Sequence, residues 1–418
     1  MGTLEACPLG SFLRFGGFGR PLIVVGVTHP QTCLVLRGRL RSLRAAGFRV
    51  VLISSPGELV TRIADEEGVE HCAISMQRGI SPLADLISLV RLCFALIRLQ
   101  PAIAEFSTPK AGLLGSIASF LCRVPVRIYI LRGLRLETAA GMTRRILQLC
   151  ERITAACSHL VVCNSVSLRS QAHALGFVQR GKVRVIGNGS SSGVDVRHFI
   201  PPSSPTPDRV RESLGIPAGA PVVGFVGRLT RDKGIPELLD AFDSLQVDFP
   251  EARLLLTGWF DDSEDALSPA QRARITNHPR IHCTGFVSDT APYYHAMDVL
   301  ALPTLREGFP NAILEAAASG LPAVSTFATG ARDAVLHGRT GLLVPPGDPQ
   351  ALAAAVKRLL LSPELRREMG TAARAWVVEH FMHTSVQSLT VALYRSLIRD
   401  AEWQPAPALI KDAAAAGD

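Results

Sequence analysis

Short apolar segments alternate with longer amphipathic segments along most of the chain. Near its start, Pro21–Val27 and Phe48–Ile53 are apolar and predict strands, and a helical pattern over Arg37–Ala46 lies between them. Further strands are predicted at Val222–Val226, Arg253–Thr257, Ile281–Cys283 and Val299–Pro303. Helical stretches separate these strands. Such alternation is typical of a doubly wound α/β fold with parallel sheets.

The length of the chain and one proline-rich segment indicate two domains. At 418 residues the chain is too long for one typical domain, and 47% hydrophobic residues can fill two cores. Four prolines cluster with serines inside Ile200–Pro217, at positions 201, 202, 205 and 207. Because such composition is typical of linkers, we expect an N-terminal domain over residues 1–200 and a C-terminal domain over residues 201–384.

Two predicted helices of the first half are candidates for contact with a membrane surface. Ser81–Gln100 is apolar but is interrupted by Asp85, Arg91 and Arg98, so we interpret it as an amphipathic helix and not as a membrane span. This helix either packs on the first sheet or lies on a membrane surface. Gly141–Arg152, with two arginines near its start, is the second candidate.

Two carboxylates eight positions apart follow the predicted strand at Val299–Pro303. Glu307 lies in the loop at the strand's carboxyl end, Pro310 suits the first position of the next helix, and Glu315 lies about one and a half turns into that helix. Ligands of open α/β sheets bind at this edge, where the helix start offers N–H groups to an anion. The pair therefore indicates sugar hydroxyls beside a phosphate, unless both are solvated surface groups.

A second cluster of charged residues follows the strand at Val222–Val226. Gly227 and Arg228 end the strand, and Lys233 lies five positions later beside Gly234. Two cations at a strand-to-helix turn, with glycines that let the backbone approach a ligand, predict a diphosphate site. A basic surface turn without a ligand is the alternative.

Taken together, these motifs resemble those of retaining glycosyltransferases of family 4. The resemblance is closest to the capsule and cell-surface polysaccharide transferases and is strongest from Val222 to about Ala355. The segments that carry it are Gly227–Leu229 with Lys233–Gly234, Glu307–Pro310 with Leu314–Ala316, Gly338–Pro345 with Asp348, Asn188–Gly189 with Gly193–Asp195, Thr108–Gly112 and Ala328–Asp333. It implies the GT-B architecture, in which two Rossmann-like domains face each other across a cleft. It also implies that a long final helix, about Pro363–Arg399, crosses back so that residues 385–410 join the first domain.

The same resemblance implies a role for each site residue. Arg228 and Lys233 would neutralise the leaving diphosphate, Glu315 would bind the nucleotide ribose, and Glu307 would hold hydroxyls of the transferred sugar. The acceptor would attack from the face that the leaving group departs, without a protein nucleophile, metal or other cofactor. The other residues implied to surround the donor are Gly227, Gly308, Phe309, Pro310, Phe286 and Arg132.

Two of these positions carry alternatives. Phe286 resembles a base-contact residue of the family, and a core phenylalanine is the equal alternative. Arg132 stands before Gly133 where many relatives carry a histidine that contacts the donor sugar, so that histidine's role does not transfer directly.

Lys110 and His29 are the candidates for acceptor binding in the first half. Each lies in a loop at the carboxyl end of a predicted strand, facing the expected cleft. Lys110 is a candidate ligand of an acceptor diphosphate, with a structural or solvent-facing lysine as the alternative. Relatives often carry a glycine pair in the loop of His29, which this chain lacks.

The charge distribution indicates an anionic second partner. Residues 1–200 carry a net charge of +13 and residues 201–418 a net charge of −5. A lipid-diphosphate acceptor or a membrane surface fits this excess, whereas nucleic acid does not, because no aromatic-laced basic segment accompanies it. Scattered solvated arginine is the alternative.

The cysteine pattern and the start of the chain suggest a reducing compartment. Nine cysteines occur without a Cys-x-x-Cys pair, and no signal-peptide pattern opens the sequence. We therefore expect reduced thiols in a cytoplasmic protein that visits the inner face of the membrane.

The sequence as a whole predicts transfer of a UDP-activated sugar, such as an N-acetylhexosamine, to a polyprenyl-diphosphate-linked saccharide. A nucleotide-sugar 2-epimerase of the same architecture and a non-catalytic sugar-nucleotide sensor are the alternatives. A nicotinamide oxidoreductase is disfavoured because no strand-linked Gly-x-Gly-x-x-Gly is evident.

Overall fold

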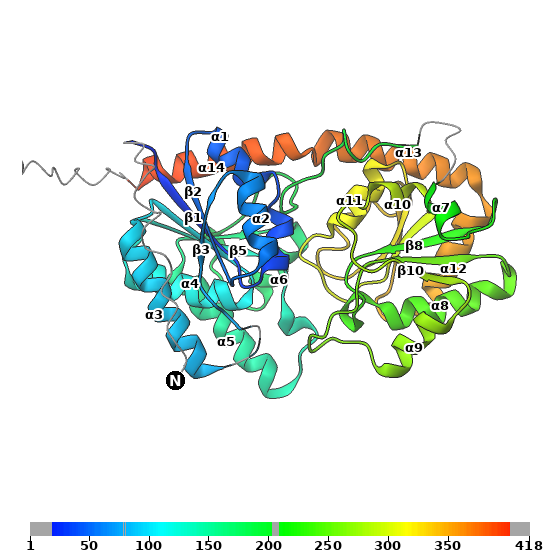
Figure 1. Ribbon diagram of the computed structural model, residues 1–418, viewed down its shortest axis with the longest axis horizontal. Helices are drawn as coiled ribbons and strands as arrows, with labels where there is room; N and C mark the ends of the chain where they lie inside the picture. The colour runs from blue at the N-terminus through cyan, green and yellow to red at the C-terminus, as the bar shows by residue number, and fades with distance from the viewer. Residues whose placement is uncertain (1–18, 78, 80, 203–208, 402–418) are drawn as a thin grey trace, which may run out of the picture.

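A computed structural model of the chain describes residues 19–77, 79, 81–202 and 209–401. It consists of two α/β domains side by side, with the last helix running back over the first domain (Figure 1). Part of the predicted linker, residues 203–208, and residues 402–410 of the predicted final helix lie outside the described residues.

The first domain is built on a seven-stranded parallel sheet with the order β3-β2-β1-β4-β5-β6-β7. Its strands are β1 (Leu22–Gly26), β2 (Arg49–Ser54), β3 (Glu70–Ala73), β4 (Ile103–Ser107), β5 (Val126–Leu131), β6 (Leu160–Cys163) and β7 (Val183–Val185). Its helices are η1 (Pro30–Leu36), α1 (Arg39–Ala45), α2 (Glu58–Glu67), α3 (Pro82–Leu99), α4 (Pro109–Leu121), η2 (Arg135–Glu137), α5 (Gly141–Cys157), α6 (Val166–Ala174) and η3 (Arg180–Lys182). The core on one face lies under α1 and α2, and that on the other under α3 and α4.

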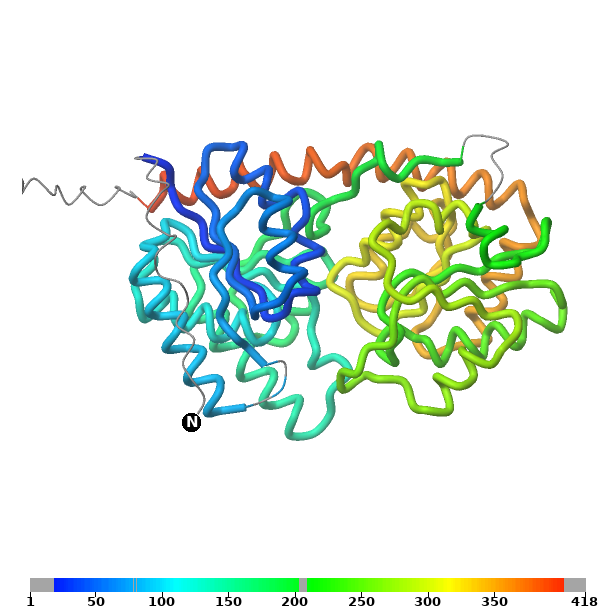
Figure 2. The backbone as a smooth tube through the Cα atoms, in the orientation of Figure 1, coloured from blue at the N-terminus to red at the C-terminus, as the bar shows by residue number. Residues whose placement is uncertain are grey.

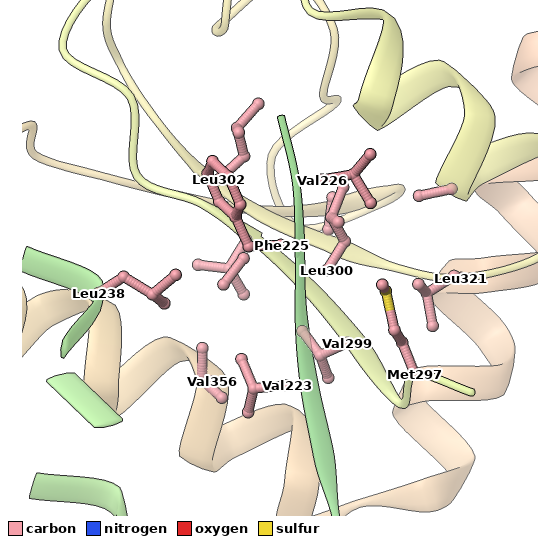
Figure 3. Packing of buried hydrophobic residues seen from close by; sticks show 14 of the residues in the cluster. Val223, Phe225, Val226, Leu238, Met297, Val299, Leu300, Leu302, Leu321 and Val356 are labelled. Carbon is pink, nitrogen blue, oxygen red and sulfur yellow. The ribbon is translucent and has the colours of Figure 1, made fainter. Parts of the chain in front are cut away.

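The second domain is built on a six-stranded parallel sheet with the order β10-β9-β8-β11-β12-β13. Its strands are β8 (Val222–Val226), β9 (Arg253–Thr257), β10 (Ile281–Cys283), β11 (Val299–Leu302), β12 (Ala323–Thr326) and β13 (Gly341–Val344). Its helices are α7 (Arg209–Ser213), η4 (Arg231–Lys233), α8 (Ile235–Asp248), α9 (Pro269–Asn277), α10 (Ala291–His295), α11 (Asn311–Ala318), α12 (Pro349–Leu361) and α13 (Pro363–His380). Strand β8 lies at the centre, with Val223 and Phe225 packed among side chains of β11, α8 and α12 (Figure 3).

Both sheets reverse their strand order at one point, between β1 and β4 in the first and between β8 and β11 in the second. The chain runs outward on one side of β1 or β8 before it crosses to the other side. Loops that leave the two central strands therefore diverge at the carboxyl edge, which opens a crevice for a ligand. The predicted doubly wound pattern thus places the loops after β8 and β11 at a switch point.

Three predicted element boundaries are wrong. The helix predicted at Arg37–Ala46 is α1, which begins only at Arg39 because its N-cap, Gly38, lies in the left-handed region at φ 74°. The 3₁₀ turn η1 ends before it, at Leu36. Pro310 is not the first helical residue. It is the extended N-cap of α11, with ψ 107°, and the helix begins at Asn311.

The predicted long final helix is two helices, α13 and α14 (His383–Asp400). The helix breaks at Phe381 and Met382 because this segment bonds instead to the chain that leaves the first domain. The Val194 N–H donates to the Phe381 carbonyl, and the His383 N–H donates to the Val194 carbonyl, both at 2.9 Å. Both crossings between the domains therefore lie side by side (Figure 2).

Helix α14 packs on the first domain. Its Tyr394 is fully buried in the core formed with β1, α1 and α2. The Tyr394 hydroxyl contacts both Arg39 and Glu105, which are themselves joined by two hydrogen bonds of 2.8 and 2.6 Å. Helix α14, which follows the second domain in sequence, is thus anchored to the first domain.

Candidate active site

The loops after β8 and β11 bring the two predicted motifs of the second domain together. The Lys233 ammonium forms an ion pair with the Glu307 carboxylate, and these side chains are only 16% and 14% exposed. The residues lie 74 positions apart in sequence. The two loops, which the family resemblance assigns to one donor site, are thus in contact.

Two carboxylates hold Arg228 beside this pair. Its guanidinium lies 3.2 Å from Asp261 and 3.6 Å from Asp232, and its side chain is one-third exposed. Asp232 is buried and accepts a hydrogen bond of 2.6 Å from Thr230. Although burial opposes it, the cations Lys233, Arg306 and Arg228 and the Thr230 hydroxyl hold the pKa of Asp232 below its usual range. The carboxylates therefore orient the cations without removing Arg228 from solvent.

Glycines allow the turns of this site to pack against one another. Gly234 has φ +74°, and a Cβ there would lie 2.0 Å from the Pro303 carbonyl oxygen. A Cβ on Gly258 would lie 1.7 Å from the Gly227 carbonyl oxygen. Backbone at both positions thus comes closer than any other residue type permits.

Glu315 lies inside the second domain, on α11. Its carboxylate accepts hydrogen bonds from the Tyr294 hydroxyl at 2.8 Å and the Thr290 hydroxyl at 3.2 Å. Burial raises the pKa of Glu315, against the effect of these two bonds and of His198. The carboxylate is therefore held in a fixed orientation by neutral donors, as a site for a ribose requires.

Three further residues predicted to bind the nucleotide-sugar donor differ in which of their atoms a ligand could reach. Phe286 is 49% exposed and packs edge-on against Trp259 with ring centroids 5.5 Å apart, so it is not a core phenylalanine. The Phe309 ring is buried against Phe381, so only the backbone of Phe309 is available to a ligand. Pro310 is buried at the N-cap of α11, beside Asn311, whose buried side-chain oxygen has no hydrogen-bond partner.

The first domain contributes Arg132 and Gly133 to the opposite wall. A Cβ on Gly308 would lie 2.3 Å from the Arg132 carbonyl oxygen, so the backbones of the two domains are in contact here. All three guanidinium nitrogens of Arg132 are buried and have no hydrogen-bond partner. Burial, together with the nearby Arg39, lowers the pKa of Arg132 to about 10, while Glu105 opposes the shift. Arg132 is thus a buried cation whose guanidinium N–H groups donate no hydrogen bond within the protein.

The predicted acceptor residues lie at the switch point of the first sheet. The Lys110 ammonium pairs with Asp85 of α3, which agrees with the structural alternative for this lysine. His29 is the N-cap of η1 and accepts a hydrogen bond from the Gln31 N–H at 3.3 Å. Between them, the Thr28 and Thr108 hydroxyls lie 2.6 Å apart, and Thr108 has the strained φ of +72°.

Several residues at the domain interface were missed by the sequence analysis. The Asp333 carboxylate accepts hydrogen bonds from the Ser167 hydroxyl and, at 3.2 Å, its N–H, and thereby caps α6 of the other domain. Arg306 donates to the Thr138 hydroxyl across the cleft at 2.8 Å and to Asp265 at 2.8 Å. The only sequence signals were proximity to Glu307 and membership of the segment Ala328–Asp333.

Metal binding has no evident site in the described part of the chain. Among the residues that the structure describes, no group of three or more His, Cys, Asp and Glu side chains is arranged to hold a metal ion. The expectation that the reaction needs no metal stays a prediction. In the same part of the chain, no helix is both long and apolar enough to cross a membrane.

Comparisons with known proteins match both domains. A family described as glycosyl transferases group 1 matches residues 220–362, and a glycosyl transferase 4-like domain matches residues 35–189. The capsular polysaccharide biosynthesis glycosyltransferase CapM of Staphylococcus aureus is 32% identical over 376 residues, which are 90% of this chain and 97% of CapM.

Solved structures share the fold. HepE of Anabaena, crystallised with UDP and glucose, has a TM-score of 0.76 and 21% identity, with 90% of this chain and 100% of that chain covered. A UDP-N-acetylglucosamine 2-epimerase has a TM-score of 0.61 and 13% identity, with 93% and 99% covered. These likenesses confirm the predicted architecture of two Rossmann-like domains, which transferases and epimerases share.

Proposed function

This chain belongs to glycosyltransferase family 4, whose GT-B fold and two matched domains it shares, and from that premise we propose that it transfers a sugar from a UDP-sugar to a polyprenyl-diphosphate-linked saccharide. The coarser statement, a GT-B glycosyltransferase of polysaccharide biosynthesis, rests on the family and on the likeness to CapM. The donor, the acceptor and the stereochemistry are the proposal.

The observation that carries the proposal is the Lys233–Glu307 pair at the switch point of the second sheet. A cation and an anion that are paired and mostly shielded are preorganised for a substrate with a negative diphosphate and a hydroxyl-rich sugar. When the donor enters, Lys233 exchanges its carboxylate partner for phosphate oxygens, and Glu307 becomes free to accept hydrogen bonds from the sugar.

Fixed cations beside the diphosphate promote cleavage of the bond between the sugar and the nucleoside diphosphate. Departure of the nucleoside diphosphate leaves negative charge on its oxygens, which Arg228 and Lys233 neutralise from a fixed geometry. Asp232 and Asp261 hold the Arg228 guanidinium in place through contacts of 3.6 and 3.2 Å. Glu315, kept in orientation by Tyr294 and Thr290, accepts the hydroxyls of the ribose.

The acceptor hydroxyl attacks from the face that the diphosphate leaves, so the anomeric configuration is retained. Its proton passes to the departing phosphate oxygen, which requires no protein nucleophile. The Arg132 backbone contacts Gly308, and its buried guanidinium, which has no hydrogen-bond partner, is our candidate for binding phosphate or sugar oxygens. No metal is part of this proposal.

The choice of a UDP-sugar is supported by HepE, whose structures contain UDP and glucose or UDP-glucose. An N-acetylhexosamine is our candidate for the sugar. The net charge of +13 over residues 1–200 supports a lipid-linked acceptor, which the enzyme would meet at the inner face of the cell membrane.

A donor panel tests the reaction. Purified protein is given UDP- and GDP-sugars with and without membrane extract that contains polyprenyl-diphosphate saccharides, and nucleotide release is measured. Release that requires one UDP-sugar and the lipid fraction supports the proposal. Conversion of a sugar nucleotide without any acceptor would instead identify an epimerase, and binding without turnover would identify a sensor.

Two variants test the site. Lys233→Ala should lower transfer by about 100-fold or more because the diphosphate loses a fixed cation. Glu307→Gln should lower transfer while calorimetry shows that UDP still binds. The matched controls are Lys357→Ala, which breaks an exposed ion pair with Asp248, and Glu251→Gln, whose side chain is 67% exposed. Wild-type turnover in both site variants would refute the assignment.

A further inference from the structure

Helices α3, α4 and α5 lie next to one another on one face of the first sheet (Figure 1). Each of them has large apolar side chains that are exposed. We call this surface the α3–α5 face. Its exposed apolar residues are Leu83, Leu86, Ile87, Val90, Phe94 and Ile97 on α3, Phe120 and Leu121 on α4, and Met142, Ile146, Leu149 and Ile153 on α5. Exposed fractions range from 38% to 74%. So many exposed apolar side chains on three neighbouring helices are typical of an interaction site.

Several residues together form the exposed apolar side of α3. Its apolar positions recur every three or four residues from Leu83 to Ile97, which places them along one side of the helix. The opposite side, with Ser88, Leu92 and Leu96, packs on the sheet. Helix α3 is therefore apolar on both sides, and only one side has a partner in the described chain.

Helix α5 buries polar residues and exposes apolar ones, the reverse of an ordinary surface helix. Its buried residues are Glu151, Thr154 and Ala155, whereas Met142, Ile146, Leu149 and Ile153 form an exposed stripe at helical spacing. A helix that buries a carboxyl group and exposes four large apolar side chains is arranged for an apolar environment outside the fold.

The charged residues of the α3–α5 face have one sign. On these three helices, all of which the structure describes, the exposed charged side chains are Arg91, Arg98, Arg144, Arg145 and Arg152. The acidic residues are withdrawn: Asp85 pairs with Lys110, and Glu151 accepts from Tyr129. Arg91 and Arg98 lie seven positions apart, as do Arg145 and Arg152, so each pair flanks an apolar stripe.

A surface pocket of about 540 Å³ borders this face at the end of α4. Phe120, Leu121, Arg123, Arg127 and His159 line it, and the Arg127 guanidinium lies 5.5 Å from the centre of the Phe120 ring. The pocket thus combines cations with apolar walls, as a phospholipid phosphate and its acyl chains would require.

We propose that the α3–α5 face docks the enzyme on a bilayer that contains anionic phospholipid. Apolar stripes enter the boundary between headgroups and acyl chains, and the flanking arginines contact lipid phosphates. A second copy of the chain fits less well, because a twofold contact would bring arginines against arginines. The purpose of docking rests on the proposed function, whereas the docking itself rests on this face alone.

The geometry also relates the bilayer to the cleft. Helices α3, α4 and α5 follow the parallel strands β3, β4 and β5, so each begins at the carboxyl edge of the sheet, where the cleft lies. Lys110, in the first turn of α4, stands at this border. A lipid diphosphate at the membrane surface would therefore reach the cleft from the edge of the α3–α5 face at which these three helices begin.

Vesicle sedimentation tests the proposal with the full chain. Wild-type protein should bind phosphatidylcholine vesicles that contain phosphatidylglycerol and should bind pure phosphatidylcholine vesicles at least about tenfold more weakly. The charge variant Arg98→Gln with Arg152→Gln and the apolar variant Phe94→Ser with Leu149→Ser should each reduce binding roughly tenfold or more. Residues 98, 152, 94 and 149 lie outside the candidate active site.

The matched controls are Arg367→Gln with Arg339→Gln for charge and Val247→Ser with Leu361→Ser for apolar surface. The latter two are 84% and 64% exposed on the second domain. All variants should keep wild-type affinity for UDP, which separates this test from the proposed function. Equal binding to neutral vesicles, unchanged binding by the face variants, or a wild-type dimer that the apolar variant dissociates would each overturn the proposal.

Discussion

At the scale of single residues, the first domain buries ionisable groups that an apolar core would exclude. Glu151 of α5 is buried, and its carboxylate oxygens lie 3.1 and 3.3 Å from the Tyr129 hydroxyl. Burial raises the pKa of Glu151 to about 7, although the Tyr129 bond opposes the shift. A raised folded pKa means that protonated Glu151 favours the fold below its ordinary pKa, and this contribution is lost as the pH rises through about 7.

Glu151→Gln should therefore stabilise the protein at pH 8, where the wild type must bury a charged carboxylate. The expected gain in free energy of unfolding is on the order of 3 kcal/mol, and it should shrink towards zero near pH 5. Denaturant unfolding of both proteins at the two pH values measures it. Glu368→Gln, on the exposed side of α13, is the control and should show no such pH dependence. A gain of the same size at both pH values would contradict the assignment.

Arg132 presents the opposite charge without a partner. Its three guanidinium nitrogens are buried and unbonded, which costs free energy in the ligand-free protein. Arg132→Met should raise the melting temperature by a few degrees and lower transfer at least about tenfold, because the cost is offset only when an anion enters the cleft. Thermal unfolding and nucleotide release are the two measurements. The exposed Arg184→Met is the control, and a destabilised but fully active Arg132→Met would refute this account.

At the scale of elements, the strand-to-helix turns decide where the charged groups meet. The turn after β8 contacts the turn after β11: the Leu305 N–H donates to the Asp232 carbonyl at 2.9 Å, and Gly234 packs against Pro303. Local patterns identify such turns, but only the packed sheet shows that two of them touch. The same holds for the break between α13 and α14, where a pairing with Val194 overrides a continuous helical pattern.

Gly234→Ala should cost several kcal/mol of stability and abolish transfer, because its Cβ would lie 2.0 Å from a backbone oxygen. Gly219→Ala is a matched control, since Gly219 has φ +78° and no atom within 4 Å of the added Cβ. It should cost only about 1 kcal/mol, from the left-handed backbone alone. Denaturant unfolding and transfer assays compare the two. Similar losses in both variants would show that backbone conformation, and not the close contact, matters at Gly234.

At the scale of the whole molecule, polar contacts hold the two domains face to face. Asp333 caps α6, Arg306 bonds Thr138, and Thr329 donates to Glu137 at 2.7 Å, all across the cleft. These contacts are hydrogen bonds between polar groups, so they are suited to opening and closing around a substrate. They also position Arg132 against Glu307 and Gly308.

Asp333→Ala should loosen this closed arrangement, because the Ser167 N–H and hydroxyl lose their acceptor. We expect a larger radius of gyration by small-angle X-ray scattering and a several-fold loss of transfer. Asp348→Ala is the control, since Asp348 caps α12 within the second domain through the Ala351 N–H at 2.8 Å. That variant should lose stability without expanding. An unchanged radius of gyration in Asp333→Ala would show that other contacts hold the domains.

The sequence by itself determined what depends on neighbouring positions. Apolar segments predicted strands β1, β2, β8, β9, β10 and β11, with Arg253–Thr257 and Ile281–Cys283 placed at their observed bounds, and the glycines and charges after β8 and β11 marked the candidate site and its family. These features follow from local periodicity and turn chemistry, which a single segment carries alone.

The tertiary structure decided what depends on segments far apart in the chain. It paired Lys233 with Glu307, left the guanidinium of Arg132 without a partner, joined Asp333 to α6 and turned the apolar side of α5 outward. A local pattern states that a residue is charged or apolar but not which distant group it meets. The free energy of these long-range contacts comes from packing and from electrostatic interactions between elements. Such interactions form only once the sheets have formed.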